Sequence, residues 1–205
     1  MIDHLVYAAP DLEGAVEGLE RLSGIRAAPG GRHPGWGTRN ALLALGPRTY
    51  LEILAPDPDR SDPELPAVFG LAGLQVPRLV AWAARAVRLE ERVADAARQG
   101  VRLGDVLEGS RESPDGTTLA WRLTDPSVRL GDGVVPFLID WGSSAHPAGT
   151  APKGAVLENL RAEHPDPSGV RSILSILGLP LRVDRGHSPA LVATLRTSGG
   201  PIELR

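Results

Sequence analysis

The chain has no cysteine, few aromatic residues and no long apolar segment. None of its 205 residues is Cys, which excludes disulfides, thiolate catalysis and zinc–thiolate sites. Aromatic residues make up only 4%, so Val, Leu, Ile and Ala must fill most of the core. No apolar run approaches the roughly 20 residues that cross a bilayer, and the N-terminus lacks the basic and apolar segments of a secretion signal. The composition therefore predicts a cytoplasmic protein that does not bind membranes.

An excess of positive charge is also absent. The formal net charge is −3 and the isoelectric point is about 6.0. Both values argue against a surface that binds nucleic acid through basic side chains. Lys153 is the only lysine, and it lies in a segment rich in Gly and Pro that is typical of a linker. We therefore expect neither a nucleic-acid partner nor chemistry that depends on a lysine.

A unit of one strand, one helix and further strands recurs along the chain. In the first copy, a strand at residues 2–8 is followed by an amphipathic helix and by strands at 40–45 and 49–54. A fainter copy spans about 78–145, and a third occupies 155–205. Units that each bury one face of a sheet have to pair in order to close a core. The pattern predicts an α+β fold built from repeated βαβββ modules.

Two connectors rich in Pro, Gly and polar residues separate the three copies. Residues 56–77 join the first copy to the second, and residues 142–154 join the second to the third. Within the second copy, residues 114–116 predict a turn because Pro, Asp and Gly stand together there. We expect one domain at 1–148, with modules at about 1–56 and 78–145, and an additional module at 155–205.

Two residues that could hold a metal lie within apolar strands of the first copy. His4 follows Ile2 and Asp3 in the first strand, and Glu52 stands in the middle of the last strand. A carboxylate in a half-buried strand is unfavourable unless it is paired or binds a cation. Together they would supply half of a site for Zn, Fe, Mn or Ni. The alternative is a solvent-facing Glu and an edge histidine with ordinary hydrogen bonds.

The segment 30–40 is rich in Gly, Pro and His, and such a loop brings backbone close to a ligand. Its Gly-Trp-Gly has no third glycine and no helix after it, so it is not a dinucleotide-binding motif. His33, Arg39 and Asn40 are predicted to contact a substrate. The alternative is a glycine-rich turn whose histidine caps a strand.

The chain resembles a known superfamily. The motifs Ile-Asp-His-Leu-Val at 2–6, Pro-Asp-Leu at 10–12 and Tyr-Leu-Glu at 50–52 resemble the first module of the vicinal oxygen chelate superfamily. Segment 30–40, Pro-Phe-Leu-Ile-Asp-Trp at 136–141 and the later His146-Pro147 are similar to its glyoxalase-like domain family. The resemblance covers about residues 1–148, and the third copy only as a generic module.

This resemblance implies that two modules pair into an open barrel around a divalent metal. The ligands come from the first and fourth strands of each module, and His4 and Glu52 stand at matching positions. The second copy departs from the pattern, because it offers Val80, Ala81 or Trp82 where a first-strand ligand is expected.

The remaining ligand depends on which modules pair. If the first two copies pair, Asp140 is the acid of the fourth strand; if the first and third pair, Glu203 takes that role. Adjacency along the chain favours the first two copies and therefore Asp140. His33 is predicted to replace the absent first-strand ligand, and Trp141 is predicted to contact the substrate.

The resemblance implies a small-molecule metalloenzyme whose metal chelates two adjacent oxygens of the substrate and stabilises an enolate or similar oxyanion. Lyase, isomerase and dioxygenase chemistry all stay open at this point. The alternative is a non-catalytic protein that binds a small ligand on the same scaffold, which the absent second-module ligand favours. The third module would pack on the barrel or be completed by another subunit, which is compatible with a homodimer.

Overall fold

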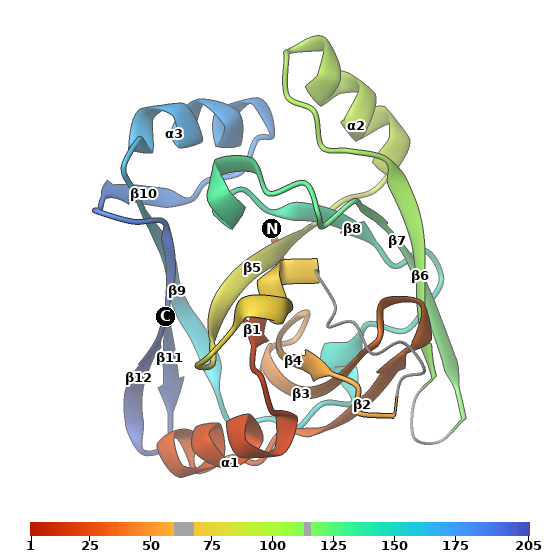
Figure 1. Ribbon diagram of the computed structural model, residues 1–205, viewed down its shortest axis with the longest axis vertical. Coiled ribbons are helices and arrows are strands. Elements are labelled where there is room, and N and C mark those ends of the chain that lie inside the picture. Colours follow the sequence, from red (N-terminus) through yellow and green to blue (C-terminus); the bar gives the residue numbers. More distant parts are fainter. Residues whose placement is uncertain (60–67, 113–115) are drawn as a thin grey trace.

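The computed structural model describes residues 1–59, 68–112 and 116–205 (Figure 1), so the predicted turn at 114–116 lies mostly outside them. Three units of the same element order follow one another along the chain. The first unit contains β1 (Ile2–Ala8), α1 (Leu12–Ser23), β2 (Ala28–His33), β3 (Thr38–Gly46) and β4 (Thr49–Pro56). The second contains β5 (Arg78–Arg85), α2 (Leu89–Arg98), β6 (Val106–Glu112), β7 (Thr118–Thr124) and β8 (Phe137–Asp140). The third contains β9 (Val156–His164), α3 (Pro167–Ile176), β10 (Arg182–Arg185), β11 (Ala190–Thr197) and β12 (Gly200–Leu204).

The first two units form one barrel, with the strand order β1-β4-β3-β2-β6-β7-β8-β5. The predicted α+β fold of βαβββ modules, with the first two modules paired, is confirmed. The barrel is closed rather than open, because its two halves meet along two lines. β1 pairs with β5 along its whole length in antiparallel orientation. The described residues of β2 and β6 meet at a single pair, Arg32 and Glu112.

The third unit forms a separate four-stranded sheet in the order β10-β9-β11-β12. It has the predicted elements but not the same strand pairing. In the first unit, β1 pairs in parallel with β4, whereas in the third β9 pairs in parallel with β10. β12 is therefore an edge strand beside β11 and not a counterpart of β4 in the sheet. Its Glu203 is half exposed and pairs with Arg205, outside the barrel.

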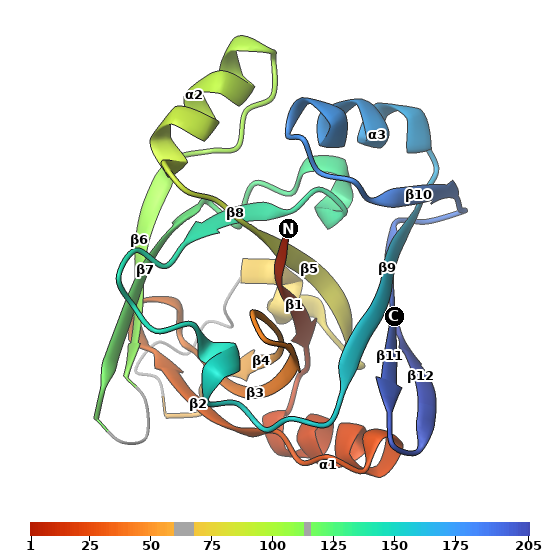
Figure 2. The same ribbon diagram turned by 180° about the vertical axis from the view of Figure 1, so that it is seen from behind.

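The C-terminal sheet stands along one side of the barrel, with α1 at one end of the molecule and α2 and α3 at the other (Figures 1 and 2). A backbone hydrogen bond from the amide of Leu79 to the carbonyl of Arg205 connects β5 to the end of this sheet. A second one, from the amide of Ala44 to the carbonyl of Pro152, holds the segment that leads to β9 against β3. None of the helices in the described residues is long and apolar enough to cross a membrane.

Alternation along the barrel strands separates two cores. Successive side chains of a strand point to opposite faces, so in β4 Leu51 and Ile53 point outward while Tyr50, Glu52 and Leu54 point inward. The outer core lies between the barrel, α1, α3 and the C-terminal sheet. The inner core carries the polar side chains described below.

Helix α1 covers the outer face of the first unit. Asp11 caps its N-terminus by accepting a hydrogen bond from the amide of Gly14 at 2.8 Å. Gly24 ends the helix in the left-handed conformation, at φ 72°. The buried apolar face packs on the outward residues of β3 and β4. Besides the three α-helices, four short 3-10 segments lie between strands in the described residues: η1 (Pro34–Trp36), η2 (Val68–Gly73), η3 (Leu130–Gly133) and η4 (Pro147–Gly149).

Trp82 anchors the outer core at the line where the two halves of the barrel join. Its side chain is almost fully buried, and its indole nitrogen donates to the carbonyl of Val134 at 2.7 Å. We expect Trp82→Ala to lower the free energy of unfolding by about 3–5 kcal/mol, because a large cavity forms and one carbonyl loses its donor. Urea unfolding measures this change. Leu22→Ala, at a residue that is 60% exposed, is the control, and similar losses in both variants would contradict the assignment.

Candidate functional site

Four polar side chains meet inside the barrel, one from each strand of the first module. They are His4 on β1, His33 at the end of β2, Asn40 on β3 and Glu52 on β4. Each is at most 9% exposed. Because β1, β3 and β4 are adjacent strands, inward positions on them face one another across the pleat. The fold therefore gathers in one place residues that are up to 48 positions apart in the sequence.

Glu52 lies at the centre of this polar cluster. The side-chain amide of Asn40 donates to Oε1 of Glu52 at 2.6 Å. The Nε2 atom of His4 lies 3.7 Å from Oε2, and Nε2 of His33 lies 4.0 Å from Oε1. Both carboxylate oxygens are thus contacted from different strands. This buried carboxylate has one strong hydrogen-bond donor, the Asn40 amide, and two imidazole rings nearby. Such an arrangement is suited to holding and moving a proton.

Aromatic side chains enclose the polar cluster. Six of the eight aromatic residues of the chain line a cavity of about 30 Å³ around Glu52. They are Trp36, Tyr50, Phe69, Trp121, Phe137 and Trp141. Arg111, whose guanidinium carries a positive charge, lines the same cavity. The space is about that of one water molecule, and the apolar wall lowers the local dielectric constant and strengthens electrostatic interactions inside it.

A second buried carboxylate, Asp3, lies behind His4 and is fully inaccessible to solvent. It is within hydrogen-bond distance of His4 Nδ1 at 3.0 Å and His146 Nε2 at 3.2 Å. The indole of Trp141 and the guanidinium of Arg85 each donate to it at 3.1 Å. Burial acts to raise the pKa of Asp3, but its hydrogen bonds with His146 and His4 hold that pKa well below the usual range. Asp3 is therefore ionised at neutral pH.

The two imidazoles present acceptor nitrogens to the cavity. Since ionised Asp3 can only accept, Nδ1 of His4 carries the proton of this hydrogen bond, and in the neutral ring Nε2 is then an acceptor facing Glu52. His33 Nδ1 lies 2.9 Å from the hydroxyl of Thr38, and its Nε2 lies 3.5 Å from the amide nitrogen of Asn40. Burial lowers the pKa of His33, partly offset by the charge of Glu52. His33 is therefore a neutral imidazole.

Asn40 is held in place by a close approach of the neighbouring strand. Gly30 is an irregular position in the pairing of β2 with β3, and a Cβ atom there would overlap Oδ1 of Asn40. That oxygen is buried and has no hydrogen-bond partner among the described residues. The glycine thus leaves room for the amide whose other end donates to Glu52.

The structure does not bring every residue predicted from the sequence into this cavity. His4, His33, Asn40, Glu52 and Trp141 line it, whereas Arg39 and Asp140 do not. Arg39 points to the outer face of the barrel, where it pairs with Glu13 at 2.7 Å. Asp140 pairs with Arg122 at 3.3 Å and accepts a hydrogen bond from the amide of Gly142 at 2.9 Å. Arg39 and Asp140 point away from the cavity for the same reason. Each is next to an inward-pointing residue on its strand, and successive side chains of a strand point to opposite faces.

Sequence reasoning missed several residues of the site. Asp3 stands next to His4 in an otherwise apolar strand, which is an unusual place for a carboxylate and could have been noticed. Trp36, Phe69 and Trp121 could not be assigned, because they come from three separate segments that only the fold brings together. Trp121 belongs to the inner core and also forms one wall of the cavity.

The residues present do not fit the four-ligand metal site that the resemblance implies. Apart from Arg111 of β6, which is no metal ligand, the described residues of the second module that line the cavity are apolar or aromatic, including Phe137 and Ile139 of β8. No group of three His, Asp or Glu side chains is arranged to hold a metal ion in residues 1–59, 68–112 and 116–205. The first module supplies His4 and Glu52 as predicted positions, and their metal role stays a prediction. Proton transfer by a side chain of this cavity requires no metal.

The fold is similar to several solved structures. A hypothetical protein from Staphylococcus aureus has a TM-score of 0.68 at 15% sequence identity, covering 98% of this chain and 83% of its own. A methylmalonyl-CoA epimerase in complex with methylmalonyl-CoA has a TM-score of 0.50 at 24% identity, covering 71% of this chain and 97% of its own. The methylmalonyl-CoA epimerase of Mycobacterium tuberculosis has a TM-score of 0.47 at 21% identity, covering 69% and 87%. The first two likenesses support the fold alone.

Among curated proteins, none matches this chain. The family described as "Glyoxalase-like domain" matches residues 2–178, which include the whole barrel as well as β9 and α3 of the third unit. The match extends over most of the 205 residues, and the barrel of two βαβββ modules agrees with the vicinal oxygen chelate architecture. The chain belongs to the glyoxalase-like domain family.

Proposed function

We propose that the chain is a small-molecule enzyme in which Glu52 transfers a proton inside the barrel. The observation that carries this proposal is the environment of the Glu52 carboxylate. It is buried, bonded to Asn40 at 2.6 Å and faced by two imidazole nitrogens within 4.0 Å. A structural carboxylate needs only its hydrogen-bond donors, whereas acceptor nitrogens on both sides provide places to which a proton can move.

The reaction that suits this arrangement is proton abstraction next to a carbonyl group. Glu52 would take the proton from the carbon, and the electron pair of the C–H bond would pass into the carbonyl to form an enolate. The positive charge of Arg111, which lines the same cavity, would stabilise the oxyanion. Return of the proton from Glu52 to carbon completes an isomerisation or epimerisation and requires no further reactant.

Asp3 and His4 act in this proposal as positioning residues for Glu52. Asp3 fixes the ring of His4 so that an acceptor nitrogen points at Oε2 of Glu52, 3.7 Å away. A protonated Glu52 can donate a hydrogen bond to this nitrogen, whereas an ionised Glu52, which only accepts, cannot. The dyad therefore favours the protonated form of Glu52 after proton abstraction, which assists the forward step.

A substrate larger than water must displace side chains that enclose the cavity. Trp36 and Phe69 belong to the 3-10 segments η1 and η2, which lie outside the strand ladders. The walls contributed by β4, β7 and β8 are held by strand pairing instead. Entry past Trp36 and Phe69 thus disturbs fewer backbone hydrogen bonds than entry through the sheet.

The second candidate function is binding of a small ligand without catalysis. It is favoured by the largely apolar and aromatic surface that the second module, apart from Arg111, presents to the cavity, because such a surface supplies shape and desolvation. The two candidates differ in one respect that can be measured, namely whether Glu52 exchanges a substrate proton.

Exchange of carbon-bound hydrogen in deuterated water tests the role of Glu52. The probes are pyruvate, dihydroxyacetone phosphate and methylmalonyl-CoA, the last because it is bound by a protein of the same fold. We expect the wild type to accelerate deuterium incorporation into at least one probe, followed by proton NMR. Glu52→Gln should slow it about 100-fold or more, because the amide cannot accept the proton.

The matched control is Glu91→Gln, at an exposed carboxylate on α2, which should exchange at the wild-type rate. Equal exchange by the wild type and Glu52→Gln would contradict the proton-transfer role. Saturable binding of a probe without any exchange would support the binding protein instead.

Substitution of Gly30 tests the positioning of Asn40. We expect Gly30→Ala to displace the Asn40 amide and break its hydrogen bond to Glu52, because the added methyl group overlaps Oδ1. The Asn40 side-chain amide signals in nitrogen–proton NMR spectra should shift, and deuterium exchange should slow about tenfold. Gly35→Ala is the control in the same segment, since a Cβ there meets no atom within 4 Å. Unchanged Asn40 signals in Gly30→Ala would count against this role.

Metal analysis tests the metal role predicted for His4, Glu52 and Asp140. The protein is purified without a nickel column, and Zn, Fe, Mn and Ni are measured by inductively coupled plasma mass spectrometry. We expect well under one equivalent of any of them, because the cavity lacks the second-module ligands. One equivalent in the wild type that is lost in His4→Ala and Asp140→Asn would instead support the prediction made from the sequence.

A further inference from the structure

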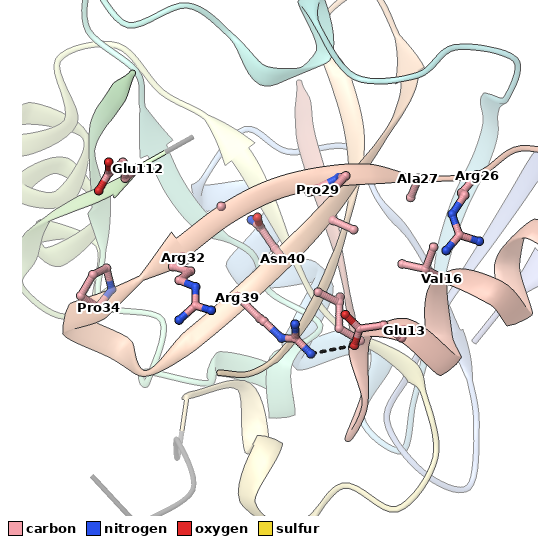
Figure 3. Close-up of a pocket in the computed structure, with 13 residues that line it drawn as sticks. Glu13, Val16, Arg26, Ala27, Pro29, Arg32, Pro34, Arg39, Asn40 and Glu112 are labelled. Atoms are coloured by element: carbon pink, nitrogen blue, oxygen red, sulfur yellow. Dashed lines mark hydrogen bonds and ion pairs between the residues drawn. The ribbon is translucent and has the colours of Figure 1, made fainter. Parts of the chain in front are cut away.

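A groove of about 570 Å³ lies on the outside of the barrel, between α1 and the strands β2 and β3 (Figure 3). It is separate from the inner cavity, and among the described residues Asn40 alone contributes to the lining of both. A volume of this size is within the range of about 300–1,000 Å³ in which proteins bind small organic molecules. The inner cavity, at about 30 Å³, is far below it.

The floor of the groove is apolar because small side chains occupy the outward positions of β2 and β3. Ala27, Pro29 and Ala41 lie on the strand side, and Leu12 and Val16 of α1 form the opposite wall. Large residues on the strands would fill this space as part of the outer core. Their absence here leaves an apolar surface open beside the helix, which favours a ligand with an apolar body.

Charged side chains stand along the rim, and two of its three arginines already have carboxylate partners outside the groove. Arg26 pairs with Glu20 at 2.5 Å. Arg32 pairs with Asp57 at 3.1 Å and with Asp59 at 2.5 Å. The side chains of Arg26 and Arg32 are more than half exposed. Because each already has a carboxylate partner, neither indicates which chemical group a ligand would carry.

Arg39 differs from these two. Its side chain is 24% exposed, and its Nη2 atom donates to Oε2 of Glu13 at 2.7 Å. Its Nε atom is buried and has no hydrogen-bond partner among the described residues. Nε and Nη2 lie on the same edge of the guanidinium, the edge that holds a carboxylate through two parallel hydrogen bonds. Glu13 satisfies one of these two donors.

The partner of Arg39 is easily replaced. The side chain of Glu13 is 58% exposed, so it can turn into water with little loss, since ion pairs with such an exposed partner contribute little to stability. Figure 3 shows Arg39 and Glu13 facing each other beside the groove. A ligand carboxylate in the place of Glu13 would satisfy both donors on this edge.

We propose that the groove between α1, β2 and β3 binds a small organic carboxylate. The apolar body lies on Ala27, Ala41 and Val16, and the carboxylate displaces Glu13 and forms two hydrogen bonds with Arg39. This site does not depend on the proton-transfer role of Glu52. It gives Arg39, predicted from the sequence as a substrate-contacting residue, a place outside the inner cavity.

Titration calorimetry with two matched probes tests the proposal. 2-Naphthoate carries a carboxylate, and 2-naphthamide has nearly the same shape without the charge. We expect 2-naphthoate to bind at a single saturable site and 2-naphthamide to bind about tenfold more weakly. Arg39→Gln should remove this difference by weakening only the carboxylate, and Glu13→Gln should strengthen 2-naphthoate binding several-fold because it frees the Arg39 edge.

Three further variants locate the binding. Ala41→Leu fills the groove and should weaken both probes, with the fold checked by circular dichroism. Arg98→Gln, at an exposed arginine of α2, and Glu52→Gln, in the inner cavity, should leave both affinities unchanged. Equal affinity for the two probes, an unaffected Arg39→Gln variant, loss of binding in Glu52→Gln, or no saturable binding at all would each overturn the proposal.

Discussion

The two-sided character of the barrel strands is the constraint on which the rest of the structure depends. The strands β1, β3 and β4 of the first module have apolar residues on their outer faces for the core under α1, and a mixture of apolar and polar residues on their inner faces. A shift of one residue in any pairing would move Glu52 or Asn40 into the outer core and move leucines inward. Burying a carboxylate there without partners is far less favourable than the observed arrangement. The register of these strands therefore brings the polar side chains together, and the need of these side chains for partners disfavours any other register.

The distribution of aromatic residues follows from the same constraint. The outer core is large but is built almost entirely from aliphatic side chains, with Trp82 as its fully buried aromatic residue. Most of the other rings stand around Glu52. A chain this poor in aromatic residues would gain more packing from placing them in the outer core. Their concentration in the inner cavity indicates that shape and low dielectric constant around the polar cluster matter there.

Strand alternation also explains how much could be predicted from the sequence. The strand–helix pattern was strong enough to predict the modules and to place His4 and Glu52 on neighbouring strands. The sequence predicts one loop over residues 30–40, but residues 30–33 belong to β2 and residues 38–40 begin β3, so Arg39 and Asn40 point to opposite faces. Asp140 points away from the cavity for the same reason. Ile139 before it and Trp141 after it line the cavity, so the side chain between them points to the opposite face. Asp3 gains its role only from His146, Arg85 and Trp141, and no local pattern predicts such a meeting.

The two lines along which the barrel closes are unequal, and this has a mechanical consequence. β1 and β5 are joined along a whole strand, whereas the described parts of β2 and β6 meet only at Arg32 and Glu112. Among the described residues, most of the ladder pairing that joins the two modules therefore lies between β1 and β5. A separation of β2 from β6 would leave the strand pairings and the helix within each module intact, because those contacts do not cross this line. The joint between the two modules is thus asymmetric, with its more extensively paired side at β1 and β5.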